Sequence, residues 1–172
     1  AVLFSGDIAS NILYGNPDGS EAEMTEAATI AQATEFIEQK KKKYKSTISQ
    51  GGSNVSGGQK QRLSIARAIA KHPDIYIFDD SFSALDYKTD ATLRAKLKEK
   101  TSESTVMIVA QRISTILHAD QIIVLDDGQI VGKGTHKELL KNCEAYYQIA
   151  SSQLSEKELE EDLKEVESYA KR

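Results

Sequence analysis

The chain has 172 residues, the size of one ordinary domain, and 40% of them are hydrophobic, which is enough for a buried core. Its 26 acidic and 22 basic residues give a net charge of −4, which counts against a general nucleic-acid binder because such proteins usually need a basic face. The one cysteine, Cys143, excludes an internal disulfide and any multi-cysteine metal site.

No apolar run approaches the roughly 18 residues that are needed to span a bilayer. The first residues also lack the basic region and the long apolar core of a signal peptide. Because the chain does not begin with methionine, we expect it to start inside a larger polypeptide. A membrane function would then require sequence that lies outside this chain.

The first half of the chain is predicted to be mainly helical. A helix is expected from Ser20, which can cap it, and acidic residues follow in its first turn. The lysine-rich run at 40–45 is interpreted as a solvated turn instead of a phosphate or lipid site, because no second basic cluster supports it. A glycine-rich loop at 51–54 then leads into a helix over 59–71.

The second half alternates apolar runs with helical patterns. The continuous apolar runs 75–78 and 105–110 predict two strands buried on both faces of a parallel sheet, with a helix at 88–100 between them. Two further strands, 121–125 and 129–131, are joined by a strong hairpin signal. Strands separated by helices indicate an α/β fold.

The tail from Ser155 to Arg172 is acidic and carries apolar residues at helical spacing, namely Leu159, Leu163, Val166 and Ala170. This pattern predicts an amphipathic helix that docks on its own domain or on a partner. A frayed terminal extension is the alternative.

The segment Ser56-Gly57-Gly58-Gln59 precedes a predicted helix and has the chemistry to hold an anion. Two glycines let the backbone approach a phosphate closely, and free amides at the helix start, with the helix dipole, favour negative charge there. Ser56 adds a hydroxyl and Gln59 an amide. A Gly-Gly turn before a helix is by itself more often an ordinary turn, so its meaning depends on the residues that come after it in the chain.

Two aspartates follow further along the chain, at the end of a predicted strand. Asp79 and Asp80 end the apolar run 75–78, and a carboxylate at the carboxyl end of a parallel strand faces the crevice where ligands bind. Mg²⁺ commonly keeps waters and takes one or two carboxylates. An anion-binding turn and a magnesium carboxylate are together what a nucleoside triphosphate needs.

The usual phosphate cradle, a loop of the form G-x-x-x-x-G-K-S/T, is missing from the sequence. Residues 128–135 look similar, but their glycines enclose three residues instead of four, and Gly134 stands where Ser or Thr should contact Mg²⁺. We therefore interpret these residues as a turn.

With these residues in this order, the chain resembles the nucleotide-binding domain of an ATP-binding cassette (ABC) transporter. The segment 55–59 matches the family signature Leu-Ser-Gly-Gly-Gln with Val for Leu, and 75–79 matches the Walker B strand. The segment 83–86 matches the D-loop, and 109–116 the switch region. Residues 3–15 resemble the segment after the Q-loop in exporters.

The resemblance implies part of a P-loop NTPase (ABC ATPase) fold that begins after the Q-loop and lacks the Walker A loop. We expect a post-Q-loop segment and helical subdomain at 1–72, a parallel-sheet α/β core at 73–150 and an acidic helix at 151–172. It also implies ATP and Mg²⁺ as ligands, and a place at the cytoplasmic face of the cell membrane. The expected partners are a second nucleotide-binding domain and the transmembrane domains, with no nucleic acid.

The family pattern also implies roles for single residues. Asp79 would hold Mg²⁺ through water, and Asp86 would bind nucleotide as part of the D-loop. In this family the signature of one domain closes over the nucleotide held by the other. The predicted contacts to the partner's ATP are therefore Ser56, Gly57, Gly58 and Gln59.

Two positions depart from the family pattern. Asp80 stands where glutamate usually polarises the attacking water, and it is one methylene shorter. Gln111 replaces a histidine that contacts the γ-phosphate, and glutamine carries no proton at neutral pH. The chain thus resembles the degenerate half of a heterodimeric multidrug or peptide exporter, with its own site weak in hydrolysis.

Two alternatives remain from the sequence. One is a soluble ABC ATPase that acts on DNA or ribosomes, although the exporter-like residues 3–15 and the acidic net charge count against it. The other is a non-hydrolytic structural module. Without a Walker A loop, this chain alone is expected to be inactive as an ATPase and to bind ATP weakly or not at all.

Overall fold

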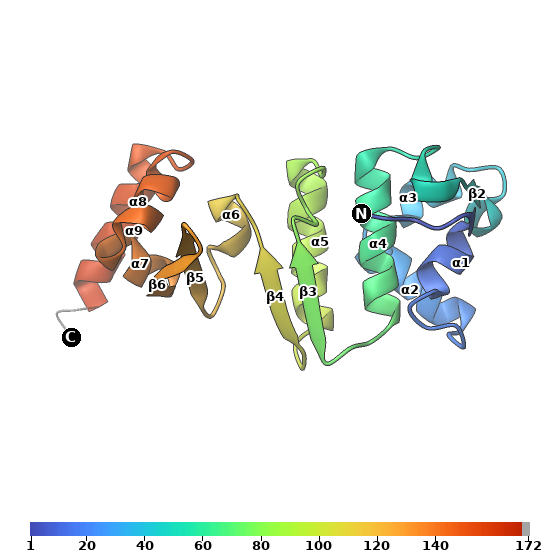
Figure 1. The fold of residues 1–172 in the computed structure, drawn as a ribbon, viewed down its shortest axis with the longest axis horizontal. Helices are drawn as coiled ribbons and strands as arrows, with labels where there is room; N and C mark the ends of the chain where they lie inside the picture. The colour runs from blue at the N-terminus through green and yellow to red at the C-terminus, as the bar shows by residue number, and fades with distance from the viewer. Residues whose placement is uncertain (170–172) are drawn as a thin grey trace. The chain divides into compact units, whose positions relative to one another are not determined.

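The computed structural model describes residues 1–169, with side chains described to residue 163. The chain divides into two compact units, Ala1–Val109 and Ala110–Arg172, whose elements Figure 1 labels. Each unit has a hydrophobic core of its own.

Unit 1, residues 1–109, begins with short helices and ends in a helix between two parallel strands. Its elements are β1 (Gly6–Asp7), α1 (Ile8–Leu13), α2 (Glu21–Ile30), α3 (Thr34–Glu38), η1 (Lys43–Lys45), β2 (Thr47–Ile48), η2 (Gln50–Gly52), α4 (Gly57–Ala70), β3 (Ile75–Asp79), α5 (Tyr87–Lys100) and β4 (Thr105–Val109). Figure 1 shows β3 and β4 side by side and pointing the same way, in the parallel pairing that runs from Ile75 opposite Thr105 to Asp79 opposite Val109.

The helix α2 begins where its capping residue predicted. The Ser20 hydroxyl accepts a hydrogen bond from the backbone N–H of Glu23, whose carboxylate in turn accepts from the N–H of Ser20. This reciprocal arrangement satisfies two of the amides that a helix start leaves without an intrahelical partner. The predicted start of α2 at Ser20 is confirmed.

A single hydrophobic core joins the helical and the strand parts of unit 1. Its buried side chains come from α1, α2, α4, β3 and α5, and include Ile12, Met24, Leu63, Phe78 and Leu93. Segments on both sides of residue 72, where the sequence suggested a boundary, bury the same core. The observed division falls after Val109.

The prediction that β3 is buried on both faces is wrong. Tyr76 and Phe78 are buried, whereas Ile75 and Ile77 are 59% and 67% exposed. Successive side chains of a strand point to opposite faces of the sheet. Within the described residues, the core of unit 1 covers only the face that carries Tyr76 and Phe78. A run of apolar residues could not distinguish this case from burial on both faces.

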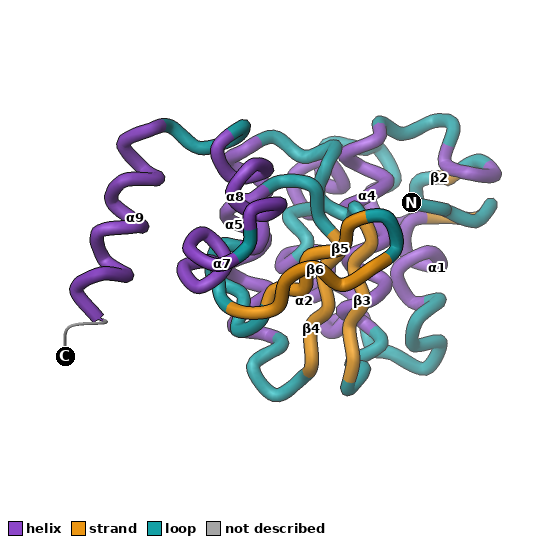
Figure 2. The backbone as a smooth tube through the Cα atoms, turned by 60° about the vertical axis from the view of Figure 1, so that its left-hand side comes forward, coloured by secondary structure: helices purple, strands orange, loops and turns teal. Residues whose placement is uncertain are grey.

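Unit 2, residues 110–172, combines a hairpin with a group of helices. Its elements are α6 (Ile113–Ile116), β5 (Ile122–Asp126), β6 (Gln129–Gly134), α7 (His136–Asn142), α8 (Glu144–Ser151) and α9 (Glu156–Tyr169). The strands β5 and β6 pair antiparallel, as Figure 2 also shows. Asp127 and Gly128 take positive φ values of 46° and 75° in the connecting turn, which confirms the predicted hairpin.

Residues 128–135 form this turn, β6 and the cap of α7, so their interpretation as a turn and not a phosphate loop agrees with the structure.

The acidic tail helix α9 packs on its own unit. Leu159 is buried in a core with residues of β5, α7 and α8, and Leu163 packs against this core. Of the apolar pattern in the sequence, the side chain of Val166 and all of Ala170 lie outside the described residues. In the part of the chain that the structure describes, no helix is long and apolar enough to cross a membrane.

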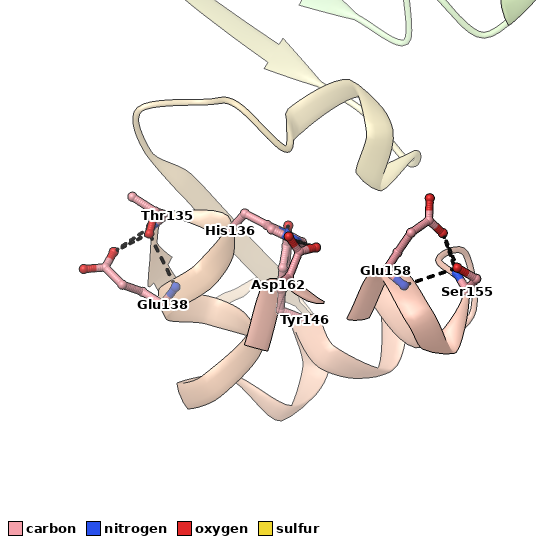
Figure 3. Close-up of polar contacts among 7 residues, drawn as sticks. All are labelled: Thr135, His136, Glu138, Tyr146, Ser155, Glu158 and Asp162. Atoms are coloured by element: carbon pink, nitrogen blue, oxygen red, sulfur yellow. Dashed lines mark hydrogen bonds and ion pairs between the residues drawn. The ribbon is translucent and has the colours of Figure 1, made fainter. Parts of the chain in front are cut away.

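A polar chain that is buried at His136 and Tyr146 and partly exposed at Asp162 helps to fasten α9 to α7 and α8 (Figure 3). His136 is buried, and its Nδ1 lies 2.7 Å from the hydroxyl of Tyr146 while its Nε2 lies 3.1 Å from Oδ2 of Asp162. Burial raises the pKa of Tyr146 to about 12, and the nearby Asp162 carboxylate adds to this increase. The tyrosine hydroxyl therefore stays neutral across the physiological range of pH.

This network predicts a loss of stability at alkaline pH. Tyrosine in an unfolded chain titrates near pH 10, so the raised pKa of Tyr146 stabilises the fold fully below about pH 10 and loses this contribution as pH rises toward about 12. In Tyr146→Phe, urea unfolding should show a weaker decline of the unfolding free energy between pH 9 and pH 11.5. The same variant should cost about 1 kcal/mol at pH 8, because a buried nitrogen of His136 loses its partner.

The matched control is Tyr147→Phe, since Tyr147 is 41% exposed and lies next in sequence. This variant should keep the decline of the parent chain. Equal alkaline declines in the parent chain and in Tyr146→Phe would contradict the assignment.

Candidate functional site

The Gly-Gly turn forms the first residues of α4 and lies at the surface. Ser56 is the N-cap: its hydroxyl accepts from the backbone N–H of Gln59 at 3.3 Å, and the Gln59 side-chain oxygen accepts from the N–H of Ser56 at 3.2 Å. Ser56 and Gly57 are exposed, and Gly58 is partly exposed. Because the first amides of a helix lack intrahelical acceptors, this end of α4 offers donors to an anion from solvent.

Gly58 has a packing reason to be glycine. A Cβ atom at this position would lie 3.0 Å from the carbonyl oxygen of Ala84, a distance tighter than most real contacts. At Gly57 an added Cβ would make an ordinary contact, 3.7 Å from Cβ of Ala84. The start of α4 thus lies directly on the turn between β3 and α5, which we call the carboxylate turn, residues 80–86.

The two predicted carboxylates lie where β3 ends. Asp79 is the last residue of the strand, and Asp80 follows it with a left-handed backbone, φ 45°. Asp tolerates this conformation better than most residues because its short side chain can bond locally. The backbone N–H of Asp80 donates to the carbonyl of Val109 at 3.1 Å, which ties the carboxylate turn to β4. Both aspartates are exposed.

The donor chemistry of this strand end fits Mg²⁺. Proteins often bind this ion through one or two carboxylates, while water and substrate phosphate supply the other ligands. Within the described residues, no group of three or more His, Cys, Asp and Glu side chains could hold a metal ion. Asp79 and Asp80 could thus contribute to a site of this kind but could not form a complete one.

Asp86 is engaged as the N-cap of α5. Its Oδ1 accepts from the backbone N–H of Thr89 at 3.0 Å, and the hydrogen bonds of the Thr89 side chain and backbone lower the pKa of Asp86. The structure therefore gives Asp86 a local role at the start of a helix. Its predicted contact to nucleotide stays a prediction.

The structure brings most of the predicted residues together in unit 1, whereas Gln111 belongs to unit 2. Gln111 is exposed, and its carbonyl accepts from the side-chain amide of Gln153 at 2.8 Å. The other end of this amide accepts from the backbone N–H of Ile113 at 2.9 Å. Gln153 thus holds the backbone at residues 111–113, and no sequence pattern pointed to it.

Gln61 is a second residue that the sequence did not single out. It lies on α4, and its side-chain amide makes three hydrogen bonds to the carboxylate turn. The helical spacing gave an indirect indication of the position of Gln61, since residues three and four positions apart share one face of a helix. Gln61 therefore shares a face with Gly57 and Gly58, but that face could not be recognised before its partner segment was known.

Comparisons with known proteins show which proteins this chain resembles. The family described as "ABC transporter" matches residues 5–83. An uncharacterized ABC transporter ATP-binding protein of Mycobacterium bovis is 49% identical over 154 residues, which cover 88% of this chain and 26% of that protein. The uncharacterized ABC transporter ATP-binding protein YfiB of Bacillus subtilis is 45% identical over 152 residues, with the same coverage of 88% and 26%.

A solved structure is similar as well. The structure of a bacterial Atm1-family ABC exporter with ATP bound matches 91% of this chain and 27% of its own, with a TM-score of 0.86 and 36% sequence identity. The chain spans about a quarter of the length of the curated relatives it matches. Its α/β fold is that of the ABC ATPases, among the P-loop NTPases. By sequence and by fold, the chain is similar to the ATP-binding parts of ABC transporters.

Proposed function

We propose that this chain is part of the ATP-binding component of an ABC exporter, at the cytoplasmic face of the cell membrane, and that ATP binding and hydrolysis there drive transport. The observation that carries the proposal is the Ser56–Gln59 turn at the surface, which offers amide donors at the start of α4, together with the two exposed carboxylates at the end of β3. The similarity to an exporter with ATP bound supports it. The transmembrane domains of the exporter are then partners of this chain.

The exposed turn acts, in this proposal, on a nucleotide held by a second nucleotide-binding domain. The free amides of α4, the Ser56 hydroxyl and the positive end of the helix dipole stabilise the phosphates of that nucleotide. Asp86, an exposed residue at the end of the carboxylate turn, contributes to the same contact. Closure of the two domains over ATP completes the partner's site.

The chain's own site is proposed to be weak in hydrolysis. Asp79 would hold Mg²⁺ through water, and the bound ion would neutralise charge on the phosphates. Asp80 is too short to position the attacking water well, since a base must lie within about 2.6–3.2 Å of the proton it accepts or act through a water. Gln111 can donate a hydrogen bond but carries no proton at neutral pH. Such a chain pairs with a different, catalytically complete partner, and it is inactive alone.

A charge placed at Ser56 tests the proposal in the intact transporter. Aspartate is as good an N-cap as serine, so Ser56→Asp should keep α4 intact while its carboxylate repels phosphate. We expect ATP turnover of the reconstituted complex to fall by about 10²-fold, the loss typical when one preorganised anion donor is removed. Steady-state phosphate release measures this.

Ser53→Asp is the matched control, because Ser53 is an exposed serine in the preceding turn and receives the same charge. This variant and Asp80→Asn should both stay close to the parent's turnover. Native turnover in Ser56→Asp, or complete loss in Asp80→Asn, would overturn the division of roles between the two domains.

A further inference from the structure

One side chain of α4 spans the carboxylate turn. Gln61 Nε2 donates to the carbonyl oxygen of Asp80 at 3.3 Å and to the hydroxyl oxygen of Ser83 at 3.2 Å. Gln61 Oε1 accepts from the backbone N–H of Ala84 at 3.0 Å. One amide group thus connects both halves of the turn to a single point on the helix.

The hydrophobic core anchors the carboxylate turn from its other side. Phe82 and Leu85 are buried in this core, at 5% and 6% exposure, whereas Ser83 and Ala84 are exposed. Two short-range hydrogen bonds stay within the turn, from the Ser83 hydroxyl to the Asp80 carbonyl at 3.1 Å and from the N–H of Leu85 to the Phe82 carbonyl at 3.1 Å. The three hydrogen bonds of Gln61 add the polar connection between the exposed part of the turn and α4.

The helix meets the turn at a second point. Gly58 lies three residues before Gln61 on the same helix face, and its Cα approaches the Ala84 carbonyl so closely that a Cβ would be 3.0 Å away. Contacts from both positions restrain translation and rotation of the turn against the helix. The exposed amides at the start of α4 are therefore held at a fixed distance from Asp79 and Asp80.

We propose that Gln61 is a positioning residue that locks the Ser56–Gln59 turn to the carboxylate turn. The turn that contacts the partner's nucleotide and the chain's own carboxylates then move as one body. This inference rests on the proposed function. Gln61 contacts no nucleotide in this proposal and acts only through the backbone of residues 80–84. Its effect is on geometry, and a displacement of about 1 Å in a reacting site can cost about 10²-fold in rate.

Gln61→Met and Gln61→Glu separate the parts of this contact. Methionine keeps the length of the side chain and loses all three hydrogen bonds, whereas glutamate keeps an acceptor for Ala84 and loses the donor to Asp80 and Ser83. In the intact transporter, Gln61→Met should lower kcat for ATP about tenfold, change KM less than twofold, and speed hydrogen–deuterium exchange of peptides that cover residues 80–86. Gln61→Glu should give intermediate values for both readouts.

Ser64→Ala is the control on the same helix, because the Ser64 hydroxyl is buried without a hydrogen-bond partner among the described residues, and its loss leaves the turn untouched. It should match the parent in both readouts. Unchanged exchange at residues 80–86 in Gln61→Met would overturn the lock itself. Faster exchange with native kcat would overturn its role in turnover. Failure of the proposed function is seen separately, as native turnover in Ser56→Asp.

Discussion

Replacing Asp80 by glutamate and Gln111 by histidine together should raise ATP turnover at this chain's own site by about 10²- to 10⁴-fold, the range that a positioned general acid or base contributes. Glutamate extends the carboxylate by one methylene toward the attacking water. Histidine restores a group that can carry a proton near neutral pH. The measurement is single-turnover hydrolysis in a transporter whose partner site has been inactivated, so that only this site contributes.

The backbone at Asp80 sets a cost for this exchange. Its φ of 45° is left-handed, where most residues other than glycine lose about 1–2 kcal/mol, and glutamate lacks the short side chain that eases this for aspartate. Thermal unfolding of each variant therefore accompanies the kinetics. Gln111→Asn with Asp80→Asn serves as the control, since it changes both positions and restores neither function. Equal turnover at both sites of the unaltered complex would contradict the idea of a degenerate site.

The features that the sequence predicted well are local ones. The Ser20 cap and the hairpin at Asp127-Gly128 each depend on a few neighbouring residues, whose conformational preferences decide the outcome. The start of α4 was expected near residue 59, and the Ser56 cap places it at Gly57. The capping pattern of Ser56 with Gln59 three residues later was present in the sequence and gives this start directly.

The features that the sequence did not predict depend on distant segments. Gln61 reaches residues 19 to 23 positions further along the chain, and Gln153 reaches back about 40 positions, so neither contact has a local signature. The exposure of one face of β3 also depends on distant segments and has no local signature. Ile75 and Ile77 are apolar whether or not a second layer covers them, and composition alone cannot reveal which face is packed.

Replacing Gly15 by alanine should destabilise unit 1 more than the same methyl group added at Gly57 or Gly58. A Cβ at Gly15 would lie 2.4 Å from the carbonyl oxygen of Arg67 and 3.3 Å from Cβ of Lys71, so the segment after α1 would have to move away from α4. The obstacle at Arg67 is backbone and cannot rotate out of the way. We expect a loss of about 3 kcal/mol, the upper part of the range for overpacking. This corresponds to a drop in melting temperature of about 6–12 °C for a chain of this size.

Gly57→Ala is the matched control, because the same methyl group would there make an ordinary contact 3.7 Å from Cβ of Ala84. Alanine is also a better helix former than glycine, so this variant should melt at or slightly above the parent's temperature. Equal melting temperatures for Gly15→Ala and Gly57→Ala would show that α1 and α4 are less closely packed than the structure has them. In the sequence, Gly15 is the last residue of the segment 3–15, and no pattern there marks it as a packing requirement. The strict requirement for glycine follows from the close approach of two backbones, which packs α1 and the residue that follows its C-cap against α4.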